Sequence, residues 1–314
     1  MTRILVLKLS ALGNVVLSLG PFAAIREHHA DAEISLLTTS AYAAWMGTSP
    51  YFDRVLIDER PAWWDLPGVL RLRRMLTGPG FTRVYDLQTS SRSCHYFRLF
   101  PRHARPEWSG IATGCSHPDR NPDRAQIHDI ERQYSQLRQA GITTAPPVDL
   151  SWSRGDIARF SLPRAFAVLV PGSSSHRPLK RWPAERYRQL ASDLIALGLT
   201  PVVVGTASEH GLARVICQDP RARDLTGQTS FGDLAELGRT AAFAVGSDTG
   251  PMHLLAAVGC PALVLFSRES DPIRCVPRAF GDGPPVRVLQ RSDLAKLSRE
   301  EVFAALPIHL EAAL

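Results

Sequence analysis

The sequence predicts an α/β protein with two doubly wound, Rossmann-like domains facing a cleft. Three observations predict this class. Short apolar runs alternate with amphipathic segments, the alternation restarts in the second half, and a turn-rich stretch separates the halves. The length of 314 residues suits two ordinary domains. We therefore expect one domain at 1–150 and another at 151–314.

The first half begins with an apolar run that a signal peptide would also show. Lys8 interrupts the run and Gly13 with Asn14 signals a turn, so a buried strand is the favoured interpretation. The segment 102–124 is rich in Pro, Arg and Gly and lacks periodicity, which favours a long functional or mobile loop. The predicted strands are 4–7, 34–37, 55–57 and 83–87, and the predicted helices are 15–28 and 128–140.

The second half repeats the alternation after the turn-rich stretch 143–147. Each apolar run is short enough for a strand of a buried parallel sheet. The predicted strands are 165–170, 201–204, 242–245 and 262–266, and the predicted helices are 186–197, 211–217 and 254–258.

Composition narrows the classes of function. The net charge of +6 and the pI of about 9.3 suit an acidic substrate or an anionic membrane surface. Nucleic-acid binding is the rival class, but the arginines lack the interleaved aromatics of an RNA-binding motif. The five scattered cysteines contain no CxxC pair, which favours a reducing cytoplasm without disulfides or zinc. No apolar run reaches the ~20 residues of a membrane span.

The most informative motif is the polar turn from Ser247 to Leu254, between two predicted strands. Backbone N–H groups and the helix dipole at such a turn suit a phosphorylated ligand. Asp248, Thr249 and Gly250 are its candidate binding residues, and His253 follows one turn into the helix. The alternative is a capped helix start, with Ser247 or Asp248 as N-cap and His253 merely packed.

Three further motifs follow predicted strands. The loop 8–14 carries Gly13, at which a ligand can approach the backbone. The loop 171–183 combines hydroxyls with cationic side chains, including Ser173 and Lys180, and such groups bind a diphosphate. Glu209 can accept both hydroxyls of a ribose. The respective alternatives are a tight turn, a solvated basic loop and a helix cap.

Together, these motifs resemble glycosyltransferase family 9, the ADP-heptose:lipopolysaccharide heptosyltransferases. The resemblance covers nearly the whole chain, and its residues are Lys8, Ser10, Leu12, Gly13, Asp86 to Gln88, Lys180 to Pro183, Asp248 to Gly250, His253, Phe266, Asp271 and Pro272. It implies a GT-B fold and an inverting enzyme that needs no metal or other cofactor. The nucleotide-sugar donor, ADP-heptose by this resemblance, is expected in the C-terminal domain and the acceptor in the N-terminal domain.

The resemblance also implies roles for individual residues. Lys180 contacts the donor phosphates, Thr249 and Gly250 supply hydroxyl and backbone donors to the diphosphate, and Glu209 holds the ribose or adenine side. Gly13 lets the donor sugar approach the first loop. Ser10, Gln88 and Arg92 are the candidate acceptor-binding residues.

Position 14 departs from the family pattern, in which the resemblance implies an aspartate that acts as the general base. Asn14 cannot accept a proton at ordinary pH. Three explanations stay open: an inactive form, another base, for which Asp86, His95 and His253 are candidates, or an acceptor that is already acidic.

Our sequence-based hypothesis is an inverting glycosyltransferase of cell-envelope assembly in the cytoplasm. Its acceptor is an anionic glycolipid or glycan such as the lipopolysaccharide core, reached at the inner membrane. Trp63 and Trp64 suit a lipid headgroup or sugar rings, or else form a packed hydrophobic lid. The alternative is a catalytically silent member that binds a sugar nucleotide or acts as a scaffold.

Overall fold

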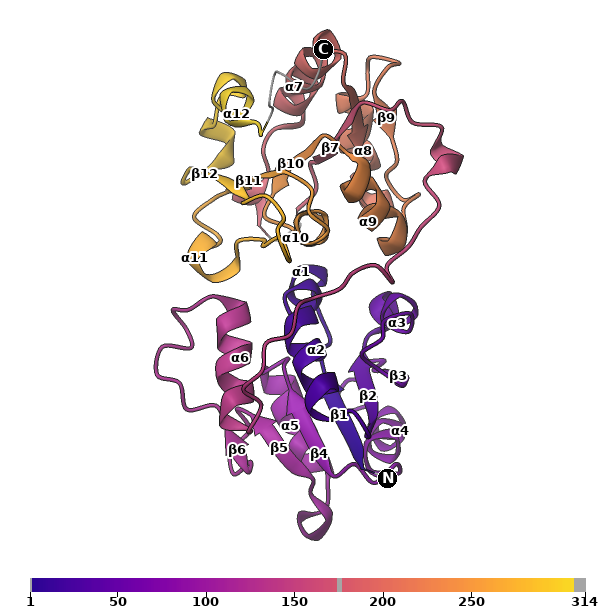
Figure 1. Ribbon diagram of the computed structural model, residues 1–314, viewed down its shortest axis with the longest axis vertical. Helices are drawn as coiled ribbons and strands as arrows, with labels where there is room; N and C mark the ends of the chain where they lie inside the picture. The colour runs from indigo at the N-terminus through magenta and orange to yellow at the C-terminus, as the bar shows by residue number, and fades with distance from the viewer. Residues whose placement is uncertain (1, 174–176, 308–314) are drawn as a thin grey trace. The chain divides into compact units, whose positions relative to one another are not determined.

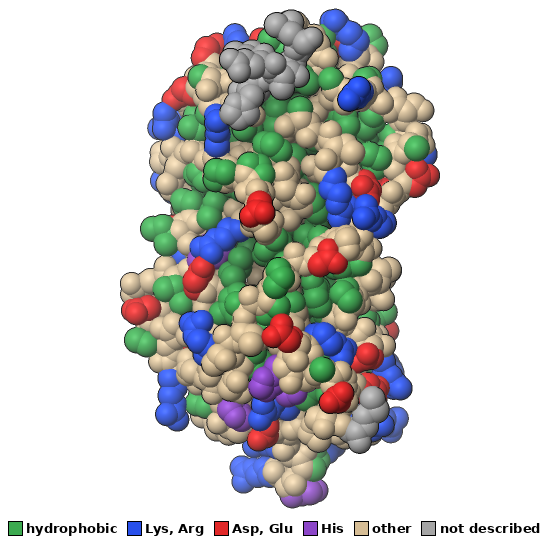
Figure 2. All heavy atoms as spheres, viewed as in Figure 1, with side chains coloured by type: hydrophobic (Ala, Val, Ile, Leu, Met, Phe, Trp, Pro, Cys, Tyr) green, Lys and Arg blue, Asp and Glu red, His purple; other side chains and the backbone are tan. Residues whose placement is uncertain are grey.

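The computed structural model describes residues 2–173 and 177–307. The chain divides into two compact units, Met1–Val148 and Asp149–Leu314, so the division falls two residues before the predicted boundary. Each unit contains a six-stranded parallel sheet with helices packed on it (Figure 1), which confirms the prediction of two doubly wound α/β units. Acidic and basic side chains are interspersed on the face drawn in Figure 2.

The sheet of unit 1 has the strand order β3-β2-β1-β4-β5-β6. Its strands are β1 (Arg3–Leu7), β2 (Glu33–Thr38), β3 (Arg54–Ile57), β4 (Arg83–Asp86), β5 (Glu107–Gly110) and β6 (His117–Pro118). Its helices are α1 (Leu12–Val16), α2 (Leu19–His28), α3 (Ser40–Met46), α4 (Leu66–Thr77), α5 (Ser91–Leu99) and α6 (Asp129–Gln139). The core strand β1 is buried from Ile4 onward because sheet partners flank it and helices cover it.

The predicted helix 15–28 is wrong as one element, because the structure has the two helices α1 and α2 there. Pro21 explains the break: in a continuous helix it would lack an N–H for the carbonyl of Leu17 and its ring would clash with that carbonyl. The helix that restarts at Leu19 places Pro21 in a first turn, where no such bond is needed. The break leaves Asn14 on the short helix α1, directly behind the first loop.

The prediction of an irregular loop at 102–124 is also wrong, because this segment contains a 3-10 helix (Arg102–Ala104), β5 and β6. Trp108 of β5 is fully buried, with its ring 5.3 Å from that of Phe97. Four residues with one large apolar side chain carry too little pattern to predict a strand, and pairing with β4 makes β5 one.

Unit 2 has the strand order β12-β11-β10-β7-β8-β9. Its strands are β7 (Phe166–Val170), β8 (Thr200–Val203), β9 (Arg223–Asp224), β10 (Phe243–Ser247), β11 (Ala262–Phe266) and β12 (Arg287–Gln290). Its helices are α7 (Ala184–Ala196), α8 (His210–Ile216), α9 (Phe231–Thr240), α10 (Gly250–Ala257), α11 (Pro272–Cys275) and α12 (Arg299–Ala305). Throughout residues 2–173 and 177–307, no helix is both long and apolar enough to cross a membrane.

Candidate functional site

The candidate donor site lies at the carboxyl edge of the unit 2 sheet. The strand order reverses between β7 and β10, which pair in parallel, so the chain leaves these neighbouring strands in different directions. Open α/β sheets bind ligands in the crevice that such a switch point creates. The loop that carries Lys180 follows β7, and the Asp248 turn follows β10. The fold therefore brings together two motifs that are 68 residues apart in the chain.

A buried ion pair joins the two motifs. Lys180 Nζ lies 2.7 Å from Asp248 Oδ2, and both side chains are less than a tenth exposed. His253 Nε2 lies 3.5 Å from the other oxygen of the same carboxylate. Burial opposes ionisation of Asp248, but His253 and Lys180 outweigh it and lower its pKa to about 2. Asp248 occupies one of the three ammonium donors of Lys180, and the other two have no hydrogen-bond partner among residues 2–173 and 177–307.

The Asp248 turn leads directly into α10. Thr249, in extended conformation, is the N-cap residue, rather than Ser247 or Asp248 as the alternative interpretation had it. The Thr249 hydroxyl donates to the carbonyl of Ser247 over 3.3 Å. The helix starts at Gly250, four residues before the predicted start at Leu254. First-turn amides have no partner within their own helix, so the turn aims backbone donors at the β10 edge.

Ser173 lies in the same loop as Lys180, after β7, and Glu209 follows the neighbouring strand β8. Glu209 ends a 3-10 helix (Ala207–Glu209) after β8, and its carboxylate accepts from the Thr206 amide at 2.7 Å. This is the helix-cap alternative, realised as a capping box. The same side chain covers Gly172, where a Cβ atom would lie 2.8 Å from Glu209 Cγ. The carbonyl of Ser173 accepts from Arg181 Nη2 at 3.1 Å, whereas the predicted loop residues 174–176 lie outside the described residues.

A residue that the sequence did not indicate borders the pair. Cys275 Sγ of α11 is 3.8 Å from Asp248 Oδ2 and 3.2 Å from the carbonyl oxygen of Asp271. Asp271 caps α11 by accepting from the Ile273 amide. Within the described part of the chain, no three His, Cys, Asp or Glu side chains form a group that could hold a metal ion.

In unit 1, Gln88 organises the first loop. Its Oε1 accepts from the amides of Leu9 at 2.8 Å and Ser10 at 3.3 Å, which brings the predicted residues Ser10 and Gln88 together. Gly13 is buried in α1, and Asn14 is exposed, with Nδ2 3.5 Å from the carbonyl of Ser10. A side chain that follows β4 thus holds the loop after β1, and the Asn14 side chain lies exposed behind this loop.

Asp86 and Lys8 are buried at the ends of β4 and β1. Asp86 Oδ1 accepts from the amides of Gln88 and Thr89 at 3.1 and 2.9 Å, and Lys8 Nζ donates to the Leu87 carbonyl at 2.9 Å. Burial raises the pKa of Asp86 to about 6, against the hydrogen bonds from these amides. Burial and the charge of Arg132 lower the pKa of Lys8 to about 7. As the fully buried Asp86 holds the β4 turn, a structural role accounts for its contacts.

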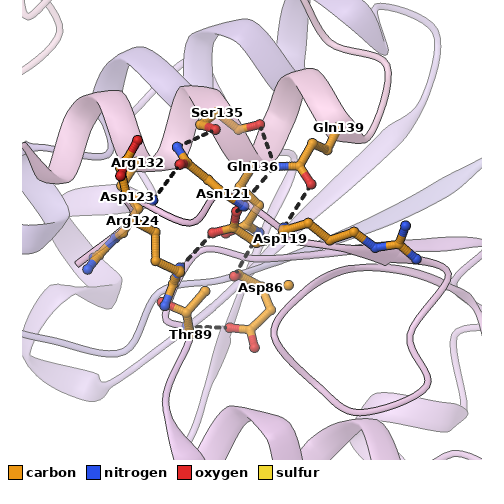
Figure 3. Close-up of polar contacts among 12 residues, drawn as sticks. Asp86, Thr89, Asp119, Asn121, Asp123, Arg124, Arg132, Ser135, Gln136 and Gln139 are labelled. Atoms are coloured by element: carbon orange, nitrogen blue, oxygen red, sulfur yellow. Dashed lines mark hydrogen bonds and ion pairs between the residues drawn. The ribbon is translucent and has the colours of Figure 1, made fainter. Parts of the chain in front are cut away.

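Helix α6 binds the backbone of Asp86 and a neighbouring segment (Figure 3). Gln136 donates to the Asp86 carbonyl at 3.0 Å, and Gln139 donates to Asp119 at 3.2 Å. Arg124 also binds Asp119, with Nε 2.7 Å from Oδ2. This network fixes the segment 119–124 on α6, within the region that the sequence indicated as a long functional or mobile loop.

The remaining candidate site residues lie on α5, in unit 1, and in unit 2. Arg92 of α5 donates to the Tyr96 hydroxyl at 2.6 Å and to the Pro61 carbonyl at 2.8 Å. His95 is exposed on the same helix, and its Nδ1 lies 2.6 Å from the carbonyl of Ser91. His253 is buried in unit 2 against Asp248. Arg92 thus makes its contacts with α5 and the 58–63 segment, and no hydrogen bond joins it to Ser10 or Gln88 among the described residues.

Substitution of Asp86 with asparagine tests its raised pKa. Because the folded-state pKa of about 6 exceeds the ordinary 3.8, the wild-type carboxyl group contributes stability below about pH 4 and loses it as the pH rises through 6. An asparagine keeps the acceptor oxygen for Gln88 and Thr89 and does not titrate. We expect the free energy of unfolding of Asp86→Asn to rise relative to wild type between about pH 4 and 7. Urea titrations across this range measure it, and a pH-independent difference would contradict the raised pKa.

The fold and the candidate site define a class of protein: a two-unit α/β protein of the GT-B type with a buried Lys180–Asp248 ion pair at the switch point of its second sheet. Residues 69–301 match the model of glycosyltransferase family 9 (heptosyltransferase), and the chain belongs to this family. The family resemblance and the fold predicted from the sequence are therefore confirmed.

Known proteins resemble this chain in sequence, and solved structures resemble it in fold. Lipopolysaccharide heptosyltransferase 2 of Salmonella typhimurium is 27% identical over 224 residues, which span 64% of this chain and 64% of that protein. The solved ADP-heptose LPS heptosyltransferase II of E. coli has a TM-score of 0.77 at 20% identity, covering 100% of this chain and 98% of that one. E. coli heptosyltransferase WaaC, solved with ADP-2-deoxy-2-fluoro heptose, has a TM-score of 0.74 at 21% identity and coverage of 96% and 98%.

Proposed function

We propose that the protein is an inverting glycosyltransferase that moves a heptose or related sugar from a nucleotide-diphosphate donor to the lipopolysaccharide core or another cell-envelope glycan. The observation that carries this proposal is the Lys180–Asp248 pair at the switch point beside the start of α10. The family membership and the lipopolysaccharide heptosyltransferases among the relatives support it.

The donor is ADP-heptose in this proposal, because a solved relative of the same fold carries an ADP-linked heptose analogue. Lys180 meets the diphosphate with its remaining ammonium donors, and the Thr249–Gly250 turn adds a hydroxyl and backbone N–H groups. Glu209 accepts from the ribose hydroxyls after exchanging its capping bonds. We propose that transfer requires no metal and takes place in the cytoplasm, at the inner face of the inner membrane.

The acceptor role falls to unit 1 in this proposal. Ser10 and Gln88 shape the loop after β1, and Asn14 is exposed directly behind it. A catalytically silent, sugar-nucleotide-binding member is the second candidate function, and the observation that favours it is the carboxamide at position 14.

Substitution of Lys180 with methionine tests the donor site. We expect the binding free energy of ADP, measured by calorimetry, to become less favourable by roughly 1.5–3 kcal/mol, because a charge-assisted hydrogen bond is lost. Methionine keeps much of the apolar stem, and the far-ultraviolet spectrum of the variant reports whether the fold is retained. Arg164→Met, an exposed position of the same unit, is the matched control. Equal ADP affinity of Lys180→Met and wild type would remove Lys180 from the site.

A further inference from the structure

We propose that the surface formed by α4, α5 and the segment before α4 docks on an anionic lipid bilayer. This inference rests on the proposed function, in which transfer takes place at the inner membrane. It assigns the contact with that membrane to specific residues of unit 1. The surface combines exposed large apolar side chains with unpaired arginines, and interfacial segments of peripheral proteins have this composition.

Exposed apolar side chains concentrate in one short stretch. Of the nine exposed large hydrophobic residues among residues 2–173 and 177–307, five lie between positions 57 and 70. They are Ile57 (45% exposed), Trp63 (39%), Trp64 (86%), Leu66 (67%) and Leu70 (48%). Isolated exposed apolar residues are ordinary, whereas a cluster of this kind indicates an interaction surface.

Helix α4 presents this surface in a defined direction. Its inner face consists of Gly68, Leu72 and Leu76, which are buried at four-residue spacing. Leu66, Leu70 and Arg74 have the same spacing on the opposite side, and all three are exposed. Two leucines and an arginine therefore form one outward line along the helix.

Arg92 and His95 of α5 hold Trp63 in front of α4. Arg92 lies over the ring of Trp63 at 5.1 Å from its centroid, and its Nη2 donates to the Pro61 carbonyl at 2.8 Å. The Trp63 ring is also 5.2 Å from that of His95, and the Tyr96 hydroxyl donates to the buried Asp58. Trp63 is thereby fixed to α5, while its neighbour Trp64 remains largely exposed. Holding an exposed tryptophan in this way reduces the conformational entropy that it loses on binding.

Positive charge predominates on this surface. Residues 57–106 contain nine arginines and four acidic residues, of which Asp58 and Asp86 are buried. Of the other two, Asp65 caps α4 and Glu59 is exposed. Five arginines here are exposed, and their side chains have no hydrogen-bond or ion-pair partner among the described residues: Arg60, Arg71, Arg74, Arg98 and Arg102.

This pattern matches a lipid surface better than a folded protein partner. An anionic bilayer attracts each nearby arginine, and it accepts tryptophan and leucine side chains at its headgroup level without a shaped pocket. Arginine stems also place apolar methylenes beside the leucines while their charged heads stay at the phosphates. The α4–α5 surface, defined by these five arginines with Trp64, Leu66 and Leu70, therefore fits an anionic membrane.

Vesicle co-sedimentation tests the proposal with the full chain. We expect binding to vesicles of phosphatidylethanolamine and phosphatidylglycerol, much weaker binding to phosphatidylcholine alone, and weakening as salt shortens the screening length. Arg71→Glu/Arg74→Glu should lose at least about tenfold in affinity, given the usual gain per basic residue at such a surface. Trp64→Ser/Leu70→Ser should also lose about tenfold, and Trp64→Phe/Leu70→Ile should restore the binding.

Matched variants in unit 2 distinguish an effect of the α4–α5 surface from an effect of net charge or of any exposed apolar side chain. Arg164→Glu/Arg223→Glu changes the net charge equally, and Leu197→Ser removes another exposed apolar side chain. Equal loss in these controls, or unchanged binding of the α4–α5 variants, would overturn the proposal. A changed oligomeric state in sedimentation velocity with unchanged vesicle binding would assign the surface to a second copy and also overturn it. The assay contains neither donor nor acceptor, so it fails or succeeds independently of the transferase proposal.

Discussion

Replacement of Asn14 with aspartate is expected to raise the rate of sugar transfer by roughly 10²–10⁴-fold, which is the contribution of a positioned general base. The side chain is exposed and lies in the first turn of α1, where a carboxylate is electrostatically favourable. The substitution adds no bulk, and the one contact that it removes is long, at 3.5 Å to the Ser10 carbonyl. We expect the pH profile of kcat/KM to gain an acidic limb from the new carboxylate.

Asn14→Gln is the matched control, because it keeps the carboxamide and cannot accept the proton. Its rate should stay at or below that of wild type. A fast wild-type enzyme that Asn14→Asp slows would place the base elsewhere and make Asn14 an orienting hydrogen-bond donor. Donor binding without transfer in wild type, together with transfer in Asn14→Asp, would identify the natural chain as a silent sugar-nucleotide-binding member.

Removal of the Asp248 carboxylate is expected to lower the free energy of unfolding by about 3–5 kcal/mol, because Lys180 would keep a buried charge without its partner. The double variant Lys180→Met/Asp248→Ala should lose much less than the sum of the single losses, since neither charge remains. Urea titration at neutral pH measures both effects.

An exposed pair provides the control. Arg221 and Asp219 are 2.8 Å apart at the surface of unit 2, so Asp219→Ala should cost less than about 1 kcal/mol. Because the pKa of Asp248 is lowered to about 2, its stabilising contribution is present above the ordinary 3.8 and is lost as the pH falls toward 2. Similar losses for Asp248→Ala and Asp219→Ala would contradict the strength assigned to the buried pair.

The parallel sheets were predictable from the sequence because buried strands appear as short apolar runs. β11 lies where it was predicted, and β1, β7 and β8 begin or end within one residue of their predictions. The strand β5 was not predictable, since its pairing with β4 and the packing of Trp108 determine it. The division into α1 and α2 depends on Pro21, a local signal that the apolar pattern of 15–28 concealed.

The candidate site was predictable in its positions and less so in its contacts. The alternation of strands and helices was enough to expect Lys180 and the Asp248 turn at one sheet edge. That Asp248 pairs with Lys180 depends on side-chain geometry between loops 68 residues apart, for which the sequence has no signal. Arg92 was expected to contact an acceptor, and its contacts with Trp63, Tyr96 and Pro61 became evident only once α5 and the 58–63 segment were packed together.

Transfer by the purified chain tests the central claim most directly. We would incubate wild type and Asn14→Asp with ADP-heptose and a heptose-deficient lipopolysaccharide core acceptor, without added metal, and measure ADP release and the mass of the acceptor. The proposed function predicts stoichiometric ADP release and an acceptor heavier by one heptose, faster with Asn14→Asp and lost with Lys180→Met. An intact donor and an unchanged acceptor with both proteins, together with no ADP binding by calorimetry, would contradict it.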